Sequence, residues 1–204
     1  MSSSSADRDP VERLAEELAR RYRDRLRRMV QLRLDRRLQG RVDASDVLQE
    51  AYLDAARRAP EYAANPALAP LLWLRLLTGQ RLLVVHRQHL GTKMRDAGQE
   101  VSLYRGALPQ ASSVSLAAQL LGRLTSPTQA AARAEMQLRL QEALNGMDPL
   151  DREILTLRHF EELSNGEAAA VLGLQKSAAS KRYVRALARL QAVLEGIPGF
   201  MDRS

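Results

Sequence analysis

Residues 163–174 limit the possible folds of this chain more than any other segment. Ser164 and Glu167 have the Ser-x-x-Glu spacing of a capping box, in which two side chains satisfy free backbone N–H groups at the start of a helix. Gly173 can supply the left-handed residue that ends a short helix, and a second helix begins near Lys176. A short helix, a glycine turn and a longer helix predict a helix-turn-helix.

The second of these helices has an apolar face and a basic face. The apolar face holds Ala179, Tyr183, Leu187, Leu190 and Leu194, and the opposite side holds Ser177, Ala178, Lys181 and Arg185, flanked by Arg182 and Arg189. A recognition helix places small polar residues in the major groove and basic residues against phosphates. A solvated helix face is the alternative interpretation, and the capping box and turn glycine weigh against it.

Apolar residues recur three or four positions apart along most of the chain, which is the pattern of amphipathic helices. We expect a first helix from Pro10 that Gly40 ends, and a second from an N-cap at Asp43 to about Arg58. Further helices are expected over 71–90, over 130–144 and over 148–160, with a short one over 115–124. Pro60, Pro66 and Pro70 predict a loop after the second helix. No segment alternates with the period of a β-strand, so the fold class is all-α.

The helices fall into two small modules, over 10–95 and 128–196. Residues 96–127 between them are rich in Gly, Ser and Pro and predict a flexible linker, while 1–9 and 197–204 are expected to be tails, the first of them disordered. The C-terminal module is expected to be a DNA-binding domain of the helix-turn-helix, winged-helix-like kind.

The chain carries a net charge of +7, and ten arginines against two aspartates over residues 20–41 account for about all of it. Such a balance favours nucleic acid or an acidic surface as partner. The absence of cysteine excludes disulfides and thiolate zinc sites, and no catalytic motif is present. We therefore expect no enzyme activity, no metal or other cofactor, no membrane insertion and a cytoplasmic, nucleoid-associated protein.

The segment MDPLDREILTLRHFEELSNGEAAAVLGL, followed by SAASKRYVRALARL, resembles the fourth conserved region of bacterial sigma factors of the extracytoplasmic-function (ECF) group, in the sigma-70 family. In that group this region carries the helix-turn-helix that binds the −35 promoter element. The resemblance implies that the DNA-facing residues are Lys176, Ser177, Ala178, Lys181, Arg182 and Arg185.

The N-terminal module resembles the second conserved sigma region. RVDASDVLQEAYLDAARR (41–58) is similar to the helix that docks on the clamp helices of the polymerase β′ subunit, which implies docking through Asp46, Gln49 and Glu50. LLWLRLLTGQRLLVVHRQHLGTKMRD (71–96) is similar to the part that melts the −10 element, which implies DNA contacts from Arg81, His86, Arg87 and Lys93. Gln80 and Val84 depart from the Asn and Asp that many ECF factors have at these positions, which removes a carboxylate.

The resemblance implies a specificity subunit that binds core RNA polymerase, through the β′ clamp helices and the β flap, and promoter DNA. An anti-sigma factor is a further possible partner. One alternative is a helix-turn-helix regulator that binds an operator without polymerase, and another is a helical adaptor for acidic proteins.

Trp73 lies in a run of leucines and is expected to be a core residue rather than a platform for an unpaired base.

Overall fold

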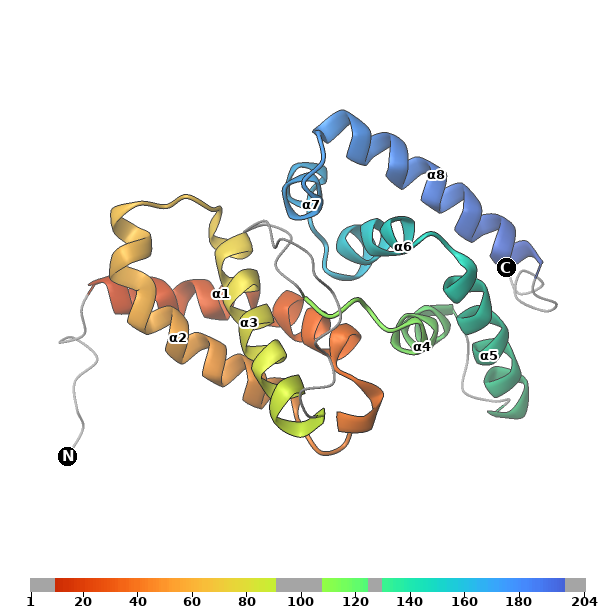
Figure 1. Cartoon of the computed structure of the whole chain (residues 1–204), viewed down its shortest axis with the longest axis horizontal. Helices are drawn as coiled ribbons and strands as arrows, with labels where there is room; N and C mark the ends of the chain where they lie inside the picture. Colours follow the sequence, from red (N-terminus) through yellow and green to blue (C-terminus); the bar gives the residue numbers. More distant parts are fainter. Residues whose placement is uncertain (1–9, 91–107, 125–129, 197–204) are drawn as a thin grey trace. The chain divides into compact units, whose positions relative to one another are not determined.

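The computed structural model describes residues 10–90, 108–124 and 130–196, and the regular elements in these ranges are all helical (Figure 1). The elements are α1 (Pro10–Arg33), η1 (Arg36–Leu38), α2 (Ala44–Ala64), α3 (Pro70–Leu90), α4 (Ser113–Leu124), α5 (Ala130–Gly146), α6 (Pro149–Leu155), η3 (Thr156–Phe160), α7 (Asn165–Leu172) and α8 (Lys176–Glu195). The all-α prediction is confirmed. The described ranges contain no strand that could form a wing.

The chain divides into two compact units, one of residues 1–30 and 34–109 and the other of residues 31–33 and 110–204. Within the described ranges, no helix is both long and apolar enough to cross a membrane. The predicted tails lie outside the described residues. The same is true of residues 91–107 and 125–129, in and around the predicted linker.

The first unit is built around α2 and α3, which pack along one another. Leucine, methionine, valine and alanine side chains from all three long helices form its core, namely Leu26, Met29, Val30, Leu48, Ala51, Ala55, Leu74 and Leu82, each at most 2% exposed. Fully burying one such leucine, valine or methionine stabilises the fold by about 1.5–3 kcal/mol. The helical periodicity of the sequence therefore identified the faces that pack.

The structure ends α1 at Arg33, so the prediction that this helix continues to Gly40 was wrong. The start of α2 agrees with the sequence prediction, but its end does not. The Asp43 carboxylate accepts a hydrogen bond of 2.7 Å from the backbone N–H of Ser45, so the predicted N-terminal cap is confirmed. The helix then continues through Pro60 to Ala64, so the prediction of a loop from Pro60 onwards was wrong. A proline ring inside a helix removes one backbone hydrogen bond, and that loss has to be offset by tertiary contacts.

Tyr62 makes the contacts that hold this last turn of α2. Its ring stacks on Trp73, with the two centroids 4.1 Å apart and the planes 11° from parallel. Its hydroxyl donates a 2.8 Å hydrogen bond to the carbonyl oxygen of Leu68. Trp73 itself is only 8% exposed, which confirms that it is a core residue.

The second unit contains α4 to α8. In this unit α4 packs against α5 and buries Leu116, Ala117 and Leu121. The short helix expected over 115–124 is thus confirmed, and it belongs to the packed C-terminal unit although it falls within the segment predicted as linker. Its apolar face was visible in the sequence, but its partner on α5 was not.

His86 on α3 is a buried polar residue of the first unit. It is 3% exposed, and its Nε2 atom accepts a 3.2 Å hydrogen bond from the backbone N–H of Asp35. Burial is the main reason that the pKa of His86 lies below its usual value. The acceptor role also requires a neutral ring, because both nitrogens of a protonated imidazole are donors.

We expect the free energy of unfolding of this protein to fall as the pH is lowered from 7 towards 5.5. The His86 pKa is lower in the folded than in the unfolded chain, so the unfolded chain binds the proton first, from about pH 6.5 downwards. Urea unfolding at several pH values measures this. His86→Gln, which keeps an acceptor but cannot titrate, should flatten the dependence, and an equally steep dependence in that variant would contradict the assignment.

Candidate nucleic-acid interface

The helix-turn-helix predicted from the sequence is formed by α7 and α8. The backbone N–H of Ser164 donates to Glu167 Oε2 at 2.7 Å, and the backbone N–H of Glu167 donates to Ser164 Oγ at 3.2 Å, so both halves of the capping box are present. Gly173 ends α7 with φ of +62°, in the left-handed region that favours glycine. The turn between the helices therefore has the predicted geometry.

A side-chain contact that the sequence did not predict joins the starts of the two helices. The amide of Asn165, the first residue of α7, donates a 2.9 Å hydrogen bond to the carbonyl oxygen of Lys176, the first residue of α8. Below it, Ala168 of α7 and Ala179 of α8 are both completely buried. Two small side chains allow the helices to approach closely, and the Asn165 amide fixes where α8 begins.

The two faces of α8 are separated as the sequence predicted, with one adjustment. Ala179 and Leu190 are buried as expected, whereas Tyr183 and Leu187 are half-buried and Ala186 takes a fully buried position. The exposed side of the helix carries Lys176, Ser177, Ala178, Ser180, Lys181, Val184 and Arg185. Five of the six predicted −35 residues thus share one accessible surface that includes the start of the helix.

The sixth predicted residue, Arg182, is held by carboxylates of the same unit. Its Nη1 atom lies 2.7 Å from Asp151 Oδ1 and 3.0 Å from Asp148 Oδ1. Asp151 also pairs with Arg189, so one carboxylate that is only 4% exposed binds two arginines of α8. These ion pairs fix the orientation of α8 on α6.

Asp148 pairs with Arg182 and also caps the start of α6. Its side chain accepts hydrogen bonds from the backbone N–H groups of Leu150 and Asp151 at the start of α6. These backbone bonds, and then the charge of Arg182, hold the pKa of the Asp148 carboxyl below its usual value. The Asp148-Pro149 pair was a recognisable helix start in the sequence, but the tertiary pairing with α8 had no sequence signal.

In the first unit, α2 supplies carboxylates that pair with Arg81, the residue that follows the departure from the ECF pattern at Gln80. Arg81 Nη2 lies 2.7 Å from Asp54 Oδ2 and 3.7 Å from Glu50 Oε2. Gln80 is exposed, and its side-chain oxygen is 3.5 Å from Arg58 Nη1. Arg81 is therefore oriented from the neighbouring helix, a role for Asp54 that sequence reasoning did not find.

The other predicted −10 residues differ in accessibility. Arg87 is exposed, His86 is buried against Asp35, and Lys93 lies outside the described residues. The buried imidazole cannot reach DNA without rearrangement of the core. Among the members of the predicted −10 set that the structure describes, Arg81 and Arg87 are the accessible ones.

The three predicted docking residues Asp46, Gln49 and Glu50 are all exposed on α2. Leu53 continues the same side of the helix one turn further on, and its side chain is 51% exposed. An exposed leucine beside polar groups suits a protein contact better than a nucleic-acid contact, since interface centres are apolar and their rims polar. Sequence reasoning did not identify Leu53, although its spacing of seven residues from Asp46 was a signal.

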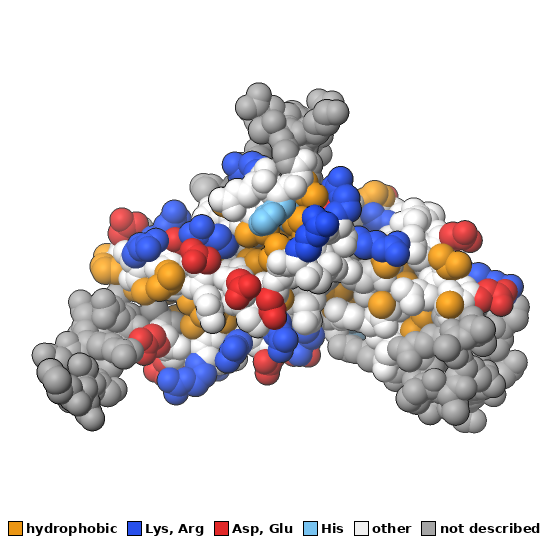
Figure 2. Space-filling model, turned by 90° about the horizontal axis from the view of Figure 1, so that it is seen from below, with side chains coloured by type: hydrophobic (Ala, Val, Ile, Leu, Met, Phe, Trp, Pro, Cys, Tyr) orange, Lys and Arg blue, Asp and Glu red, His pale blue; other side chains and the backbone are white. Residues whose placement is uncertain are grey.

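On at least one face of the protein, basic side chains are not separated from acidic ones. Figure 2 shows a face on which Lys and Arg side chains are interspersed with Asp and Glu side chains. Arg37 pairs with Asp35 and Arg57 pairs with Asp54, so basic and acidic side chains also lie together within the first unit. The arginine excess of the sequence therefore does not by itself define a DNA surface, whereas α8 carries several exposed basic residues together.

The C-terminal unit matches a known protein family. The family described as sigma-70, region 4, matches residues 137–190, which include α6, α7 and most of α8. Residues 137–190 are a sigma-70 region 4 domain. The predicted helix-turn-helix domain is thereby confirmed, and the match does not extend to the N-terminal unit.

A segment of this chain is also similar to part of known sigma-E proteins. RNA polymerase sigma-E factors of Streptomyces antibioticus and Streptomyces avermitilis are each 39% identical over 56 residues, which make up 28% of this chain and 31% of each relative. The chain thus matches about a third of the length of these curated relatives. CnrH, solved in complex with the cytosolic domain of CnrY, aligns over 92% of this chain and 98% of its own at 21% identity and a TM-score of 0.49. That likeness is too weak to support a functional assignment.

We expect Asp151→Ala to lower the free energy of unfolding of the region 4 domain by about 2–3 kcal/mol, because two arginines lose a buried partner. Urea unfolding of the full chain measures the change. Glu142→Ala removes the same charge from an exposed position of α5 and serves as the control. Equal stability of the two variants would contradict the role given to Asp151.

Proposed function

We propose that this chain is a sigma factor of the ECF type, which binds core RNA polymerase and directs transcription initiation without catalysis of its own. The observation that carries the proposal is the sigma-70 region 4 domain, whose α8 presents an exposed basic surface. The similar sigma-E factors, which match 28% of this chain at 39% identity, are named as RNA polymerase factors, and this supports the same assignment.

On the DNA side, α8 enters the major groove of the −35 element. The small side chains of Ser177 and Ala178, at the start of the helix, allow close approach to base edges, while Lys181 and Arg185 bind phosphates. Lys176 adds a charge at the helix start. Arg182 contributes its partly exposed guanidinium, and its pairing with Asp148 and Asp151 makes it a positioning residue as well.

On the polymerase side, the exposed stripe of Asp46, Gln49, Glu50 and Leu53 docks on the β′ clamp helices. Support comes from the resemblance of 41–58 to the second sigma region and from the accessibility of all four side chains. Arg81 and Arg87 belong to the −10 surface of the same unit, with Arg81 oriented by Asp54. The region 4 domain would contact the β flap, and an anti-sigma protein that competes with polymerase is a further proposed partner.

Core polymerase should co-elute with the purified chain in size-exclusion chromatography at low salt. Asp46→Asn combined with Glu50→Gln should weaken that association, because the two exposed carboxylates lose their charge. The same variant should leave the binding of the region 4 domain to −35 DNA unchanged. If the chain does not bind core polymerase but binds an operator with two half-sites on its own, the proposal is wrong and the protein is a stand-alone regulator.

Lys181→Ala and Arg185→Ala should each weaken binding to −35 DNA. If each residue neutralises one phosphate, each loss should reduce the slope of log affinity against log salt by about 0.9. Fluorescence anisotropy at several salt concentrations measures this. Arg139→Ala, which removes an exposed arginine from α5, is the control and should leave the slope unchanged. Equal slopes in all three variants would count against phosphate contacts from α8.

A further inference from the structure

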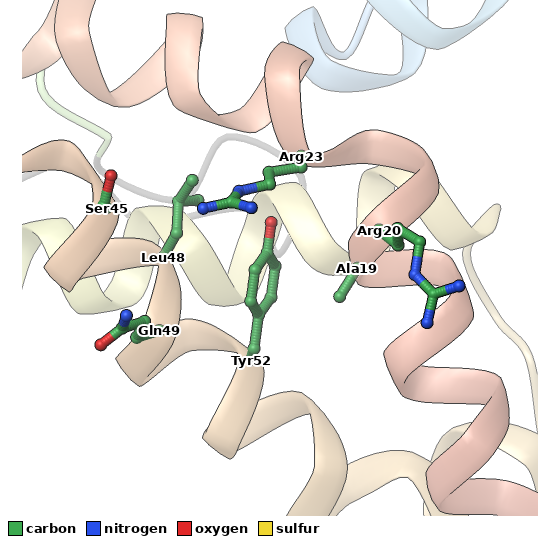
Figure 3. Close-up of a pocket in the computed structure, with 7 residues that line it drawn as sticks. All are labelled: Ala19, Arg20, Arg23, Ser45, Leu48, Gln49 and Tyr52. Carbon is green, nitrogen blue, oxygen red and sulfur yellow. The ribbon is translucent and has the colours of Figure 1, made fainter.

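A hollow of about 220 Å³ lies between α1 and α2 of the first unit (Figure 3). Its lining comes from Ala19, Arg20 and Arg23 of α1 and from Ser45, Leu48, Gln49 and Tyr52 of α2. Drug-sized ligands need pockets of about 300 Å³ or more. The hollow is therefore sized for a single side chain or a small ion rather than for an extended ligand.

The Tyr52 hydroxyl is the unusual group in this hollow. Its oxygen is inaccessible to solvent and has no hydrogen-bond partner. A buried donor without an acceptor costs about 1–3 kcal/mol, so a small rotation of this side chain that brings the hydroxyl to an acceptor from outside would recover that loss. Desolvation raises the pKa of Tyr52 to about 12, which keeps the hydroxyl protonated and able to donate at neutral pH.

The other polar groups of the lining are rich in donors. Arginine has donors and no acceptor, so neither Arg20 nor Arg23 can accept the proton of the Tyr52 hydroxyl. In Figure 3 the Arg23 guanidinium and the Tyr52 hydroxyl both extend into the space between the helices, while the Arg20 guanidinium is turned away along α1. Ser45 and Gln49 add a hydroxyl and an amide from α2, and each of these two groups can donate as well as accept. An anion with two or more acceptor oxygens satisfies this set.

We propose that this hollow is a carboxylate-binding site, and that its occupant is an aspartate or glutamate side chain of the protein that docks on α2. Gln49 links the two features, because it lines the hollow and also belongs to the proposed docking stripe. Leu48 and Ala19 supply apolar lining that suits the methylene groups of such a side chain. The identity of that protein as core polymerase rests on the proposed function, whereas the carboxylate chemistry does not.

The charges around the hollow favour a protein carboxylate over a nucleic-acid phosphate. Asp24 follows Arg23 on α1, and Asp46 and Glu50 are exposed on α2 beside Gln49. A nucleic-acid strand would bring further phosphates against these three carboxylates, and like charges repel. A protein surface could place one acidic side chain in the hollow and basic side chains against Asp46 and Glu50. Such a surface would match both the positive and the negative charges of this region.

The binding chemistry can be tested without the partner. Sodium acetate, titrated into the full-length chain at constant ionic strength, should shift the NMR signals of Arg23, Ser45, Gln49 and Tyr52, with sodium chloride as the reference salt. Tyr52→Phe, which removes only the hydroxyl, should abolish or weaken these shifts. Equal shifts with chloride, or a response to inorganic phosphate without one to acetate, would overturn the carboxylate assignment.

The partner is tested with core polymerase and matched variants. Tyr52→Phe and Arg23→Gln should each weaken binding to core by about tenfold, the effect of losing one hydrogen bond to a charged group. Arg21→Gln removes the same charge from an exposed position of α1 outside the hollow and should bind normally. If both hollow variants bind core like the wild type, the docking role of the hollow is wrong. If the wild-type chain itself does not bind core while acetate still occupies the hollow, the proposed function fails and the carboxylate site stands.

Discussion

The orientation of α8, the second helix of the helix-turn-helix, depends on one buried carboxylate. Asp151 on α6 pairs with Arg182 and Arg189 on α8, and its side chain is 4% exposed. Burial of a charge is costly unless it is paired, so the two arginines have little freedom to leave this position. Because Ala179, Ala186 and Leu190 pack on the same side of α8, the ion pairs and the apolar core present one constant face of the helix to solvent.

Pairing distinguishes two groups of basic residues in this chain. Arg81, Arg182 and Arg189 are oriented by carboxylates of their own unit. Lys176, Lys181 and Arg185 instead lie on the exposed side of α8, where small residues leave the helix start accessible. Total charge therefore says little about where a DNA surface would lie, whereas exposure and pairing together single out the outer face of α8 as the proposed one.

The sequence predicted most of what depends on local chemistry. The capping box at Ser164, the turn at Gly173 and the cap at Asp43 are each set by residues within a few positions of one another, and all three are confirmed. The length of α2 was underestimated because Pro60 was treated as a helix end, while the contacts of Tyr62 that hold the last turn come from α3 and the loop. The ion pairs of Asp54 and Asp151, and the donor-rich hollow at Tyr52, join different helices and leave no periodic signal in the sequence.

Transcription in vitro by core polymerase on genomic fragments, with start sites mapped by sequencing, tests the central claim most directly. The account predicts that this chain adds a set of start sites that share one −35 and one −10 sequence, and that Lys181→Ala with Arg185→Ala removes these starts. Identical start sites with and without the chain would contradict its assignment as a sigma factor.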